Sequence, residues 1–92
     1  MLVTVLDAKG LVCPLPVLRA RKAMKSLRPG EILEIHATDP ASRLDVPHFC
    51  DATGNELVET RTEGEVLIFR IRKSDTDTSE VSEGVPATDR RP

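Results

Sequence analysis

Hydrophobic and polar positions along the chain predict four short β-strands. Each of these segments shows the alternation or the short apolar run of Val, Leu, Ile or Phe that is typical of strands. Glu63-Gly64 separates the last two segments and predicts a tight hairpin turn. The predicted strands are the segment around Val3 and Val5 that ends near Asp7, and residues 31–37, 56–62 and 65–72.

A helical spacing of apolar residues begins at two closely spaced prolines. Proline suits the first turn of a helix, where its missing N–H has no partner to lose. We therefore expect a helix from Pro14 or Pro16 to about Leu27, ended by Pro29-Gly30. The apolar residues that recur every three or four positions and share one face of this helix are Val17, Ala20, Met24 and Leu27.

A second helix is expected from about Ala41 to Ala52. Thr38 or Asp39 is suited to cap this helix, and Pro40 to lie in its first turn. Pro47 falls inside the segment, so we expect the helix to have its first turn just before that residue or to bend there. The residues expected to face the core are Leu44, Phe49 and Cys50.

The expected order of elements is β-α-β-α-β-β. This order predicts an α/β (α+β) fold, a two-layer sandwich with two helices on one face of a four-stranded mixed sheet. The opposite face of the sheet would be open. Residues 1–73 would form this domain. Residues 74–92, dominated by Ser, Thr, Asp, Glu and Pro, are expected to form a disordered acidic tail.

Composition and charge narrow the range of functions. The 92-residue chain has no Trp or Tyr and two Phe, so a base-stacking surface for single-stranded nucleic acid is not expected. The tail has five acidic and two basic residues, a net −3, which leaves +1 for residues 1–73 of a chain whose total is −2. A nucleic-acid-binding protein usually has a clear basic excess. With no recognisable signal peptide or membrane span, we expect a cytoplasmic protein with reduced thiols.

The segment LVCPLPV places Cys13 at the entrance to the first helix. A helix N-terminus favours a thiolate because its free N–H groups and partial positive charge face the sulfur. Pro14 and Pro16 would stiffen the chain, and we expect a Cys13 pKa below the reference of about 8.5. Position alone leaves a second interpretation open, a small apolar residue packed at a loop–helix junction. The bases expected to add positive potential are Arg19, Arg21 and Lys22.

Other kinds of cysteine and histidine chemistry find little support in the sequence. There is no C-x-x-C motif for dithiol redox chemistry, and two histidines offer little for a Cys-His-Asn hydrolase. His36 and His48 do not belong to a close metal-ligand pair such as H-x-x-x-H. Cys50 follows Phe49 and is expected to be a buried structural thiol. We expect the protein to bind no metal and no cofactor.

The segment LDAKGLVCPLPVLRARKAM resembles the signature of the TusA/SirA/YedF family of small sulfur-carrier proteins. The family's Cys-Pro-any-Pro motif is present as Cys13-Pro14-Leu15-Pro16, and the likeness continues through PGEILEIHATDPASRLDVPHFC and GNELVE. The resemblance covers residues 5–73 and implies the same β-α-β-α-β-β sandwich. It also implies that Cys13 accepts a sulfane sulfur as a persulfide and relays it to a partner protein. The protein would then be a sulfurtransferase-type carrier without a cofactor rather than a stand-alone turnover enzyme.

The resemblance also implies two kinds of partner. The sulfur donor would be a cysteine desulfurase or a rhodanese-like protein. The sulfur-accepting protein would serve tRNA thiolation, molybdenum-cofactor assembly or the oxidation of sulfur compounds. The first helix would help such encounters, because its basic face could orient an acidic partner. The bases on this face are Arg19, Lys22, Lys25 and Arg28.

A regulatory or interaction module without chemistry is the competing interpretation. Such a module would bind a protein or an RNA through the basic helix or the open face of the sheet. RNA is the weaker candidate, given the nearly neutral domain and the absence of stacking aromatic residues. The two interpretations differ in one respect that can be measured, because only the carrier takes up sulfur on Cys13.

Overall fold

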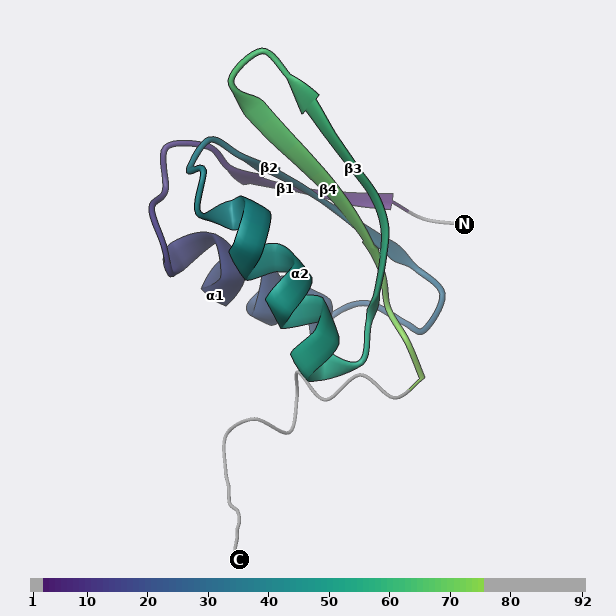
Figure 1. Ribbon diagram of the computed structural model, residues 1–92. Coiled ribbons are helices and arrows are strands. Elements are labelled where there is room, and N and C mark those ends of the chain that lie inside the picture. Colours follow the sequence, from purple (N-terminus) through teal and green to yellow (C-terminus); the bar gives the residue numbers. More distant parts are fainter. Residues whose placement is uncertain (1–2, 76–92) are drawn as a thin grey trace, which may run out of the picture.

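The chain folds into four strands and two helices in the order that its sequence pattern predicts (Figure 1). The computed structural model describes residues 3–75. Most of the predicted tail lies outside these residues, and the prediction that it is disordered is therefore not tested. The elements are β1 (Val3–Ala8), α1 (Leu15–Met24), β2 (Ile32–Ala37), α2 (Ser42–Thr53), β3 (Glu56–Glu63) and β4 (Val66–Arg72).

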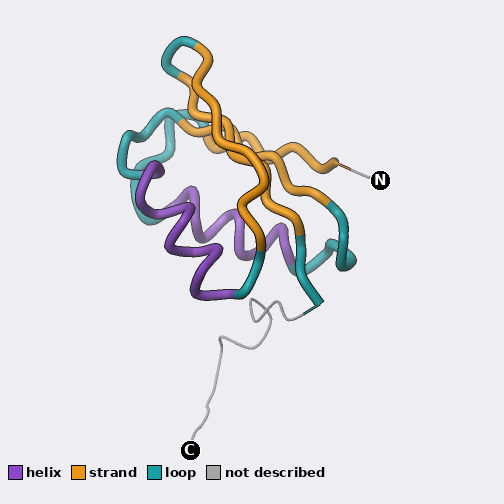
Figure 2. The backbone as a smooth tube through the Cα atoms, turned by 45° about the vertical axis from the view of Figure 1, so that its right-hand side comes forward, coloured by secondary structure: helices purple, strands orange, loops and turns teal. Residues whose placement is uncertain are grey.

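The strands form one mixed sheet in the order β1-β2-β4-β3. β1 and β2 are parallel, because α1 carries the chain back along the sheet between them. β4 is antiparallel to both of its neighbours, and Gly64, with a φ of +61°, turns the chain between β3 and β4. Both helices lie on the same face of the sheet (Figure 2), which confirms the predicted two-layer sandwich.

The core between the helices and the sheet consists mainly of aliphatic side chains. Ala20 and Met24 of α1 are fully buried, Leu27 is nearly so and Val17 is partly buried, which confirms the predicted apolar face of this helix. The side chains that pack against them from the other elements include Leu33 and Ile35 of β2, Val46 and Phe49 of α2, and Phe69 and Ile71 of β4.

α1 ends at Met24, earlier than the helical spacing suggested. Buried Lys73, just beyond β4, donates hydrogen bonds from Nζ to the carbonyl oxygens of Met24, at 2.6 Å, and Leu27, at 2.8 Å. The last carbonyls of a helix have no partner within the helix and need one from elsewhere. The Met24 carbonyl also accepts the N–H of Leu27, at 3.1 Å, in a tightened last turn, so Lys73 adds a second partner. The chain leaves the helix before Pro29 while Leu27 still packs in the core.

α2 places Phe49 and Cys50 in the core as predicted, but not Leu44. The side chain of Leu44 is 78% exposed, so the prediction that it faces the core was wrong. The buried positions of α2 include Ser42 and Val46, four residues apart, and Leu44 lies on the opposite side of the helix from both. The helix continues through Pro47 and ends at Thr53.

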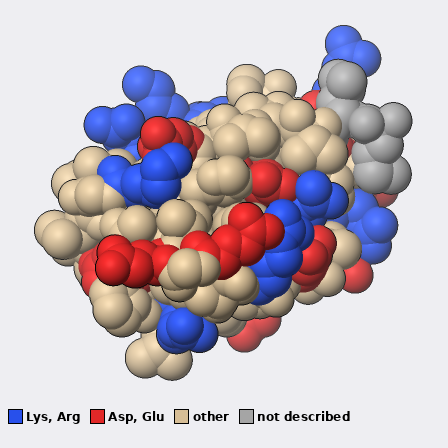
Figure 3. All heavy atoms as spheres, turned by 90° about the horizontal axis from the view of Figure 1, so that it is seen from above, with Lys and Arg blue, Asp and Glu red and all other residues tan. Residues whose placement is uncertain are grey.

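The open face of the sheet carries a row of ion pairs. Glu34 of β2 accepts a hydrogen bond from Nε of Arg70, at 2.7 Å, and lies 2.6 Å from Nε2 of His36. These two partners, His36 first, hold the pKa of Glu34 below its ordinary value. On β3, Nη1 of Arg61 lies 2.9 Å from Oε2 of Glu59. Figure 3 shows acidic and basic side chains next to one another on one face of the molecule.

Candidate functional site

Cys13 lies in the loop between β1 and α1 and is exposed to solvent. Pro14 follows it through a cis peptide bond and directly precedes α1, and Pro16 lies in the first turn of the helix, as expected. The N–H of Cys13 donates a hydrogen bond of 2.7 Å to Oδ2 of Asp39. The loop is therefore held through its backbone while the thiol stays accessible.

Two side chains tie the Cys13 loop to the start of α2. Asp39 accepts the N–H of Cys13 with one carboxylate oxygen and the N–H of Ala41, at 3.1 Å, with the other. Thr38 accepts the N–H of Gly10 through Oγ1 at 2.9 Å. We predicted that Thr38 or Asp39 caps the second helix, and this was wrong. Ala41 directly precedes α2, and no side chain caps the helix there. Thr38 binds the loop, and Asp39 divides its two oxygens between the loop and the N–H of Ala41.

Two carboxylates raise the pKa of the Cys13 thiol. The main cause is a hydrogen bond to Asp45 in the first turn of α2, followed by desolvation and by the negative charges of Asp45 and Asp39. The sequence predicted the opposite shift, from the N-terminus of α1. A helix end carries only about half of an elementary charge, whereas each carboxylate carries a full one. These carboxylates therefore disfavour the thiolate of Cys13, the form that acts as nucleophile, relative to an ordinary cysteine.

The three bases predicted to support the Cys13 thiolate lie along α1. Arg19 and Lys22 are exposed and line an open groove on the flank of the helix. The guanidinium of Arg21 instead lies over the ring of Phe49, 5.4 Å from its centroid, in a cation–π contact between the helices. Because the charges that shift the thiol pKa come from carboxylates, the supporting role of these bases stays a prediction.

Exposed apolar side chains lie on the segments that meet at Cys13, a feature that the sequence reasoning missed. Leu15 and Leu18 occupy positions of α1 that fall outside its buried face, and this offset was a signal available in the sequence. Large aliphatic side chains outside a buried face often mark a contact surface. We call this group the apolar rim; its members and exposed fractions are Val12 (64%), Leu15 (40%), Leu18 (52%) and Leu44 (78%).

Cys50 has surroundings unlike those of Cys13. Its side chain lies in the core, and the residue is 2% exposed, which confirms the predicted buried thiol. Burial, with a smaller contribution from the charge of Asp51, raises the pKa of this thiol to about 11. At neutral pH Cys50 is therefore protonated and shielded from reagents and partners.

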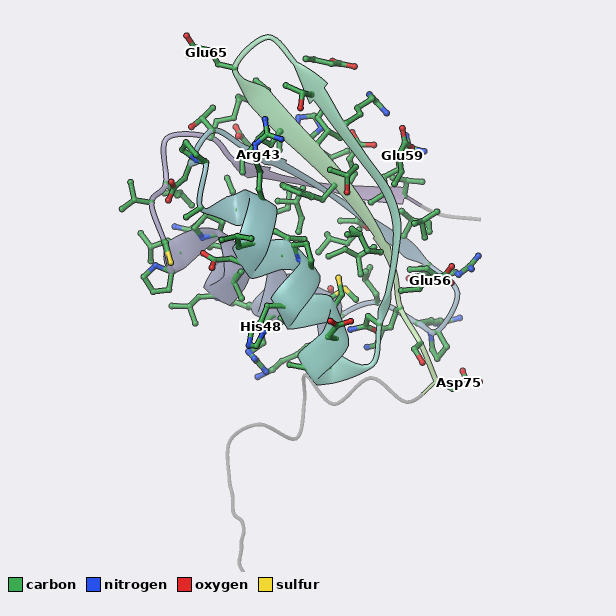
Figure 4. The ribbon with its side chains drawn as sticks, viewed as in Figure 1. Arg43, His48, Glu56, Glu59, Glu65 and Asp75 are labelled. Carbon is green, nitrogen blue, oxygen red and sulfur yellow. The ribbon has the colours of Figure 1, made fainter. Side chains whose placement is uncertain are left out.

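The two histidines do not form a metal site with the cysteines. His36 pairs with Glu34 on the open face of the sheet, and His48 projects outward from α2 (Figure 4). Within residues 3–75, no group of three His, Cys, Asp or Glu side chains is arranged to hold a metal ion. In the same part of the chain, neither helix has the length and apolar character that a membrane span requires.

Fold and site together define a class of protein, a small two-layer α/β domain that presents one cysteine at the entrance to its first helix and buries the other. The family model described as Sulfurtransferase TusA matches residues 4–73. The chain belongs to this family, which confirms the resemblance found in its sequence.

Relatives of known sequence or structure agree with this assignment. The chain is 49% identical over 69 residues to the sulfur carrier protein TusA of Allochromatium vinosum, a match that covers 75% of this chain and 91% of that one. It is 46% identical over 82 residues to YrkF of Bacillus subtilis, and this match covers 89% of the chain but only 44% of YrkF. The crystal structure of the SirA-like protein of Desulfitobacterium hafniense superposes on this fold with a TM-score of 0.67 and 27% sequence identity. The match covers 82% of this chain and 100% of that one.

Proposed function

We propose that this protein accepts a sulfane sulfur on Cys13 as a persulfide and relays it to a second protein. The observation that carries the proposal is the contrast between the two thiols of the chain. Cys13 is exposed on a loop held by Asp39, whereas Cys50 is buried in the core. Membership of the TusA family and relatives named as sulfur carriers support the same role.

Sulfur transfer of this kind is an exchange of one sulfur–sulfur bond for another. The Cys13 sulfur attacks the terminal sulfur of the donor persulfide, R–S–SH, and a new S–S bond forms as the donor S–S bond breaks. The departing donor thiolate takes up a proton, and the Cys13 thiol gives one up, so Cys13–SH and R–S–SH become Cys13–S–SH and R–SH. An acceptor thiolate then attacks the terminal sulfur on Cys13 in the same way. No external oxidant or reductant is consumed, and we propose that no cofactor or metal takes part.

The residues around Cys13 would act by holding it in place. Pro14 and Pro16 restrict the backbone after the cysteine, and Asp39 binds the Cys13 N–H. A fixed backbone limits the conformations that a partner must select, which favours productive encounters. The bases proposed to steer partners toward this end of the molecule are Arg19, Arg21 and Lys22.

The proposed donor is a cysteine desulfurase or a rhodanese-like protein, because both classes present a persulfide cysteine. The proposed acceptor is a thiol protein of tRNA thiolation, of molybdenum-cofactor assembly or of sulfur-compound oxidation. We place this relay in the cytoplasm, where the thiols of both partners stay reduced.

Intact mass spectrometry tests the proposal. The full-length chain is incubated with a cysteine desulfurase and cysteine, or with a rhodanese and thiosulfate, and then weighed with and without dithiothreitol. We expect a reducible gain of one sulfur, about 32 Da, as a persulfide forms. The gain should disappear in Cys13→Ser and persist in the matched variant Cys50→Ser.

The competing binding module makes the opposite prediction. If neither donor adds sulfur to the wild-type chain, the carrier proposal fails and a role in binding is favoured. A gain that persists in Cys13→Ser would show that another residue carries the persulfide and would also contradict the proposal.

A further inference from the structure

The two edges of the sheet differ in how their strands are protected from pairing with another chain. β3 forms one edge; it carries charged side chains, and its register with β4 shifts between Leu57 and Glu59. Charges and irregularities of this kind keep an edge strand from taking up a further strand. β1 forms the other edge, and within residues 3–75 no strand pairs with its outer side. Its only charged residue is Asp7, near its end, so β1 lacks the protection that β3 has.

The open-sheet side of β1 is apolar. Leu6 and Ala8 point toward the helices, where Ala8 is buried in the core and Leu6 packs against it. Because side chains alternate along a strand, Val3 and Val5 lie on the open face of the sheet, where they are 45% and 57% exposed. Two exposed valines on an unprotected edge strand form a surface that a further strand can cover.

The helix side of β1 is basic. Leu6 lines an open groove together with residues of α1 and of the turn that follows it, among them Arg19 and Lys22. Both cations are exposed, and within residues 3–75 neither forms an ion pair with an acidic side chain. A groove with two such cations attracts acidic side chains. The two sides of the β1 edge therefore favour different kinds of residue.

We propose that the edge of β1 accepts an extended segment of a partner protein as a fifth strand of the sheet, and that acidic and apolar residues alternate in this segment. The N–H and C=O groups on the outer side of β1 would bind the backbone of the segment. Successive side chains of a strand point to opposite faces, so acidic residues would lie over Arg19 and Lys22, and apolar ones beside Val3 and Val5. Binding at this edge does not depend on the sulfur relay proposed above.

The charge of the groove selects a partner protein over this chain itself. Two copies that paired antiparallel through β1 would place both α1 helices on the same face of the joined sheet, groove against groove. Arg19 and Lys22 of one copy would then meet the same cations of the other, which disfavours this dimer. The chain's own acidic segment lacks the required alternation, because Glu80 and Glu83 are three positions apart and would fall on opposite faces of a strand.

A synthetic peptide of alternating residues tests the proposal. A fluorescein-labelled peptide of sequence EVEVEVE is titrated with the full-length chain, and its fluorescence anisotropy is followed. We expect saturable binding with a Kd of about 100 µM or tighter. Two control peptides, EEEEVVV with the same composition in blocks and KVKVKVK with the opposite charge, should each bind at least about tenfold more weakly.

Variants of the full-length chain test the two sides of the edge separately. Lys22→Glu reverses a charge in the groove and should weaken binding of EVEVEVE about tenfold, whereas the same change at an exposed position of α2, Arg43→Glu, should not. Val5→Ser should weaken binding about fivefold, whereas Val58→Ser, which removes a 46% exposed valine from β3, should not. Circular dichroism verifies the fold of each variant.

Amide hydrogen exchange locates the bound peptide. Exchange should slow in β1 and stay unchanged in β3, because the new backbone hydrogen bonds form only at the edge of β1. Alkylation of Cys13 by iodoacetamide should keep its rate in the complex, because the peptide lies along β1 and leaves the thiol exposed.

Several outcomes would overturn the inference. These are the absence of saturable binding up to about 1 mM protein, equal binding of the block-order peptide, and unchanged binding in either Lys22→Glu or Val5→Ser. A peptide that copies residues 76–92 and displaces the probe would make the chain's own tail the occupant. A dimer seen by light scattering that Val5→Ser dissociates would make a second copy the occupant, and either result would contradict the assignment to a partner protein.

Discussion

Cys13 and Cys50 have raised pKa values for two different physical reasons. At Cys50 the main cause is burial, which a partner could relieve only by opening the core. At exposed Cys13 the main cause is a hydrogen bond to Asp45, which a partner can offset with a charge of the opposite sign. The direction of a pKa shift therefore does not identify the functional thiol. The cause of the shift distinguishes the two thiols, because only the electrostatic one can be reversed on contact.

The largest difference between the two thiols should appear in alkylation. Cys13 should react with iodoacetamide at about pH 8 at least about 100-fold faster than Cys50, because a buried thiol reacts only after local opening of the fold. Peptide mass mapping over a time course measures both rates in one sample. The contrast should vanish in urea, and comparable rates in the native protein would contradict the burial of Cys50.

High pH should weaken the fold through Cys50. Its pKa of about 11 in the folded state lies above the ordinary value of 9.0, so the folded protein keeps this proton longer than the unfolded chain does. The resulting stability is full below about pH 9 and is lost as the pH rises toward 11. We expect Cys50→Ala to remove about 2 kcal/mol of the decline in unfolding free energy between pH 8 and pH 11.

Urea unfolding at several pH values measures this decline. The chain has no tyrosine, which leaves fewer groups that titrate in this range. Cys13→Ala is the matched control. The pKa of this thiol is raised too, but by carboxylates that solvent screens at an exposed site, so the substitution should change the decline less. Identical pH profiles for the wild type and Cys50→Ala would show that burial does not shift this thiol as described.

Asp39→Ala should loosen the loop that presents Cys13. The substitution removes the acceptor of the Cys13 and Ala41 N–H groups, and it should lower the unfolding free energy by about 1 kcal/mol. Amide hydrogen exchange at Cys13 should become faster. Asp51→Ala, which removes an exposed acid from the last turn of α2, is the control and should not affect that exchange. Unchanged exchange in Asp39→Ala would contradict the tie between the loop and α2.

The smallest expected effect concerns the reactivity of the Cys13 thiol. Asp45→Asn removes the main cause that raises its pKa, so the pKa should move down toward the ordinary value. More thiolate is then present at pH 8, and alkylation of Cys13 should be severalfold faster. Iodoacetamide rates measured from pH 6 to pH 11 give the midpoint for each protein. A midpoint that stays the same or rises would show that Asp45 does not control this thiol.

The elements of the fold were largely predictable because their signals are local. The apolar spacing of Val17, Ala20 and Met24 identifies the first helix, and Gly64 marks the hairpin turn. The end of α1 was not predictable in this way. Lys73, which lies 49 residues further along the chain, binds the Met24 carbonyl and so holds this end of the helix. A contact made by a distant side chain leaves no mark in the local sequence.

The candidate site also has features that the local sequence determines and features that only the packing of distant segments determines. The sequence by itself determined the order of the elements, the place of Cys13 before the first helix and the two prolines that follow it, because neighbouring residues decide each of these. Only the tertiary structure decided the charge around the thiol and the exposure of Leu44. Asp39 lies 26 residues from Cys13 and reaches it only because α2 packs beside α1. Charges act through space rather than along the chain, so they reversed the pKa shift that the helix N-terminus alone predicts.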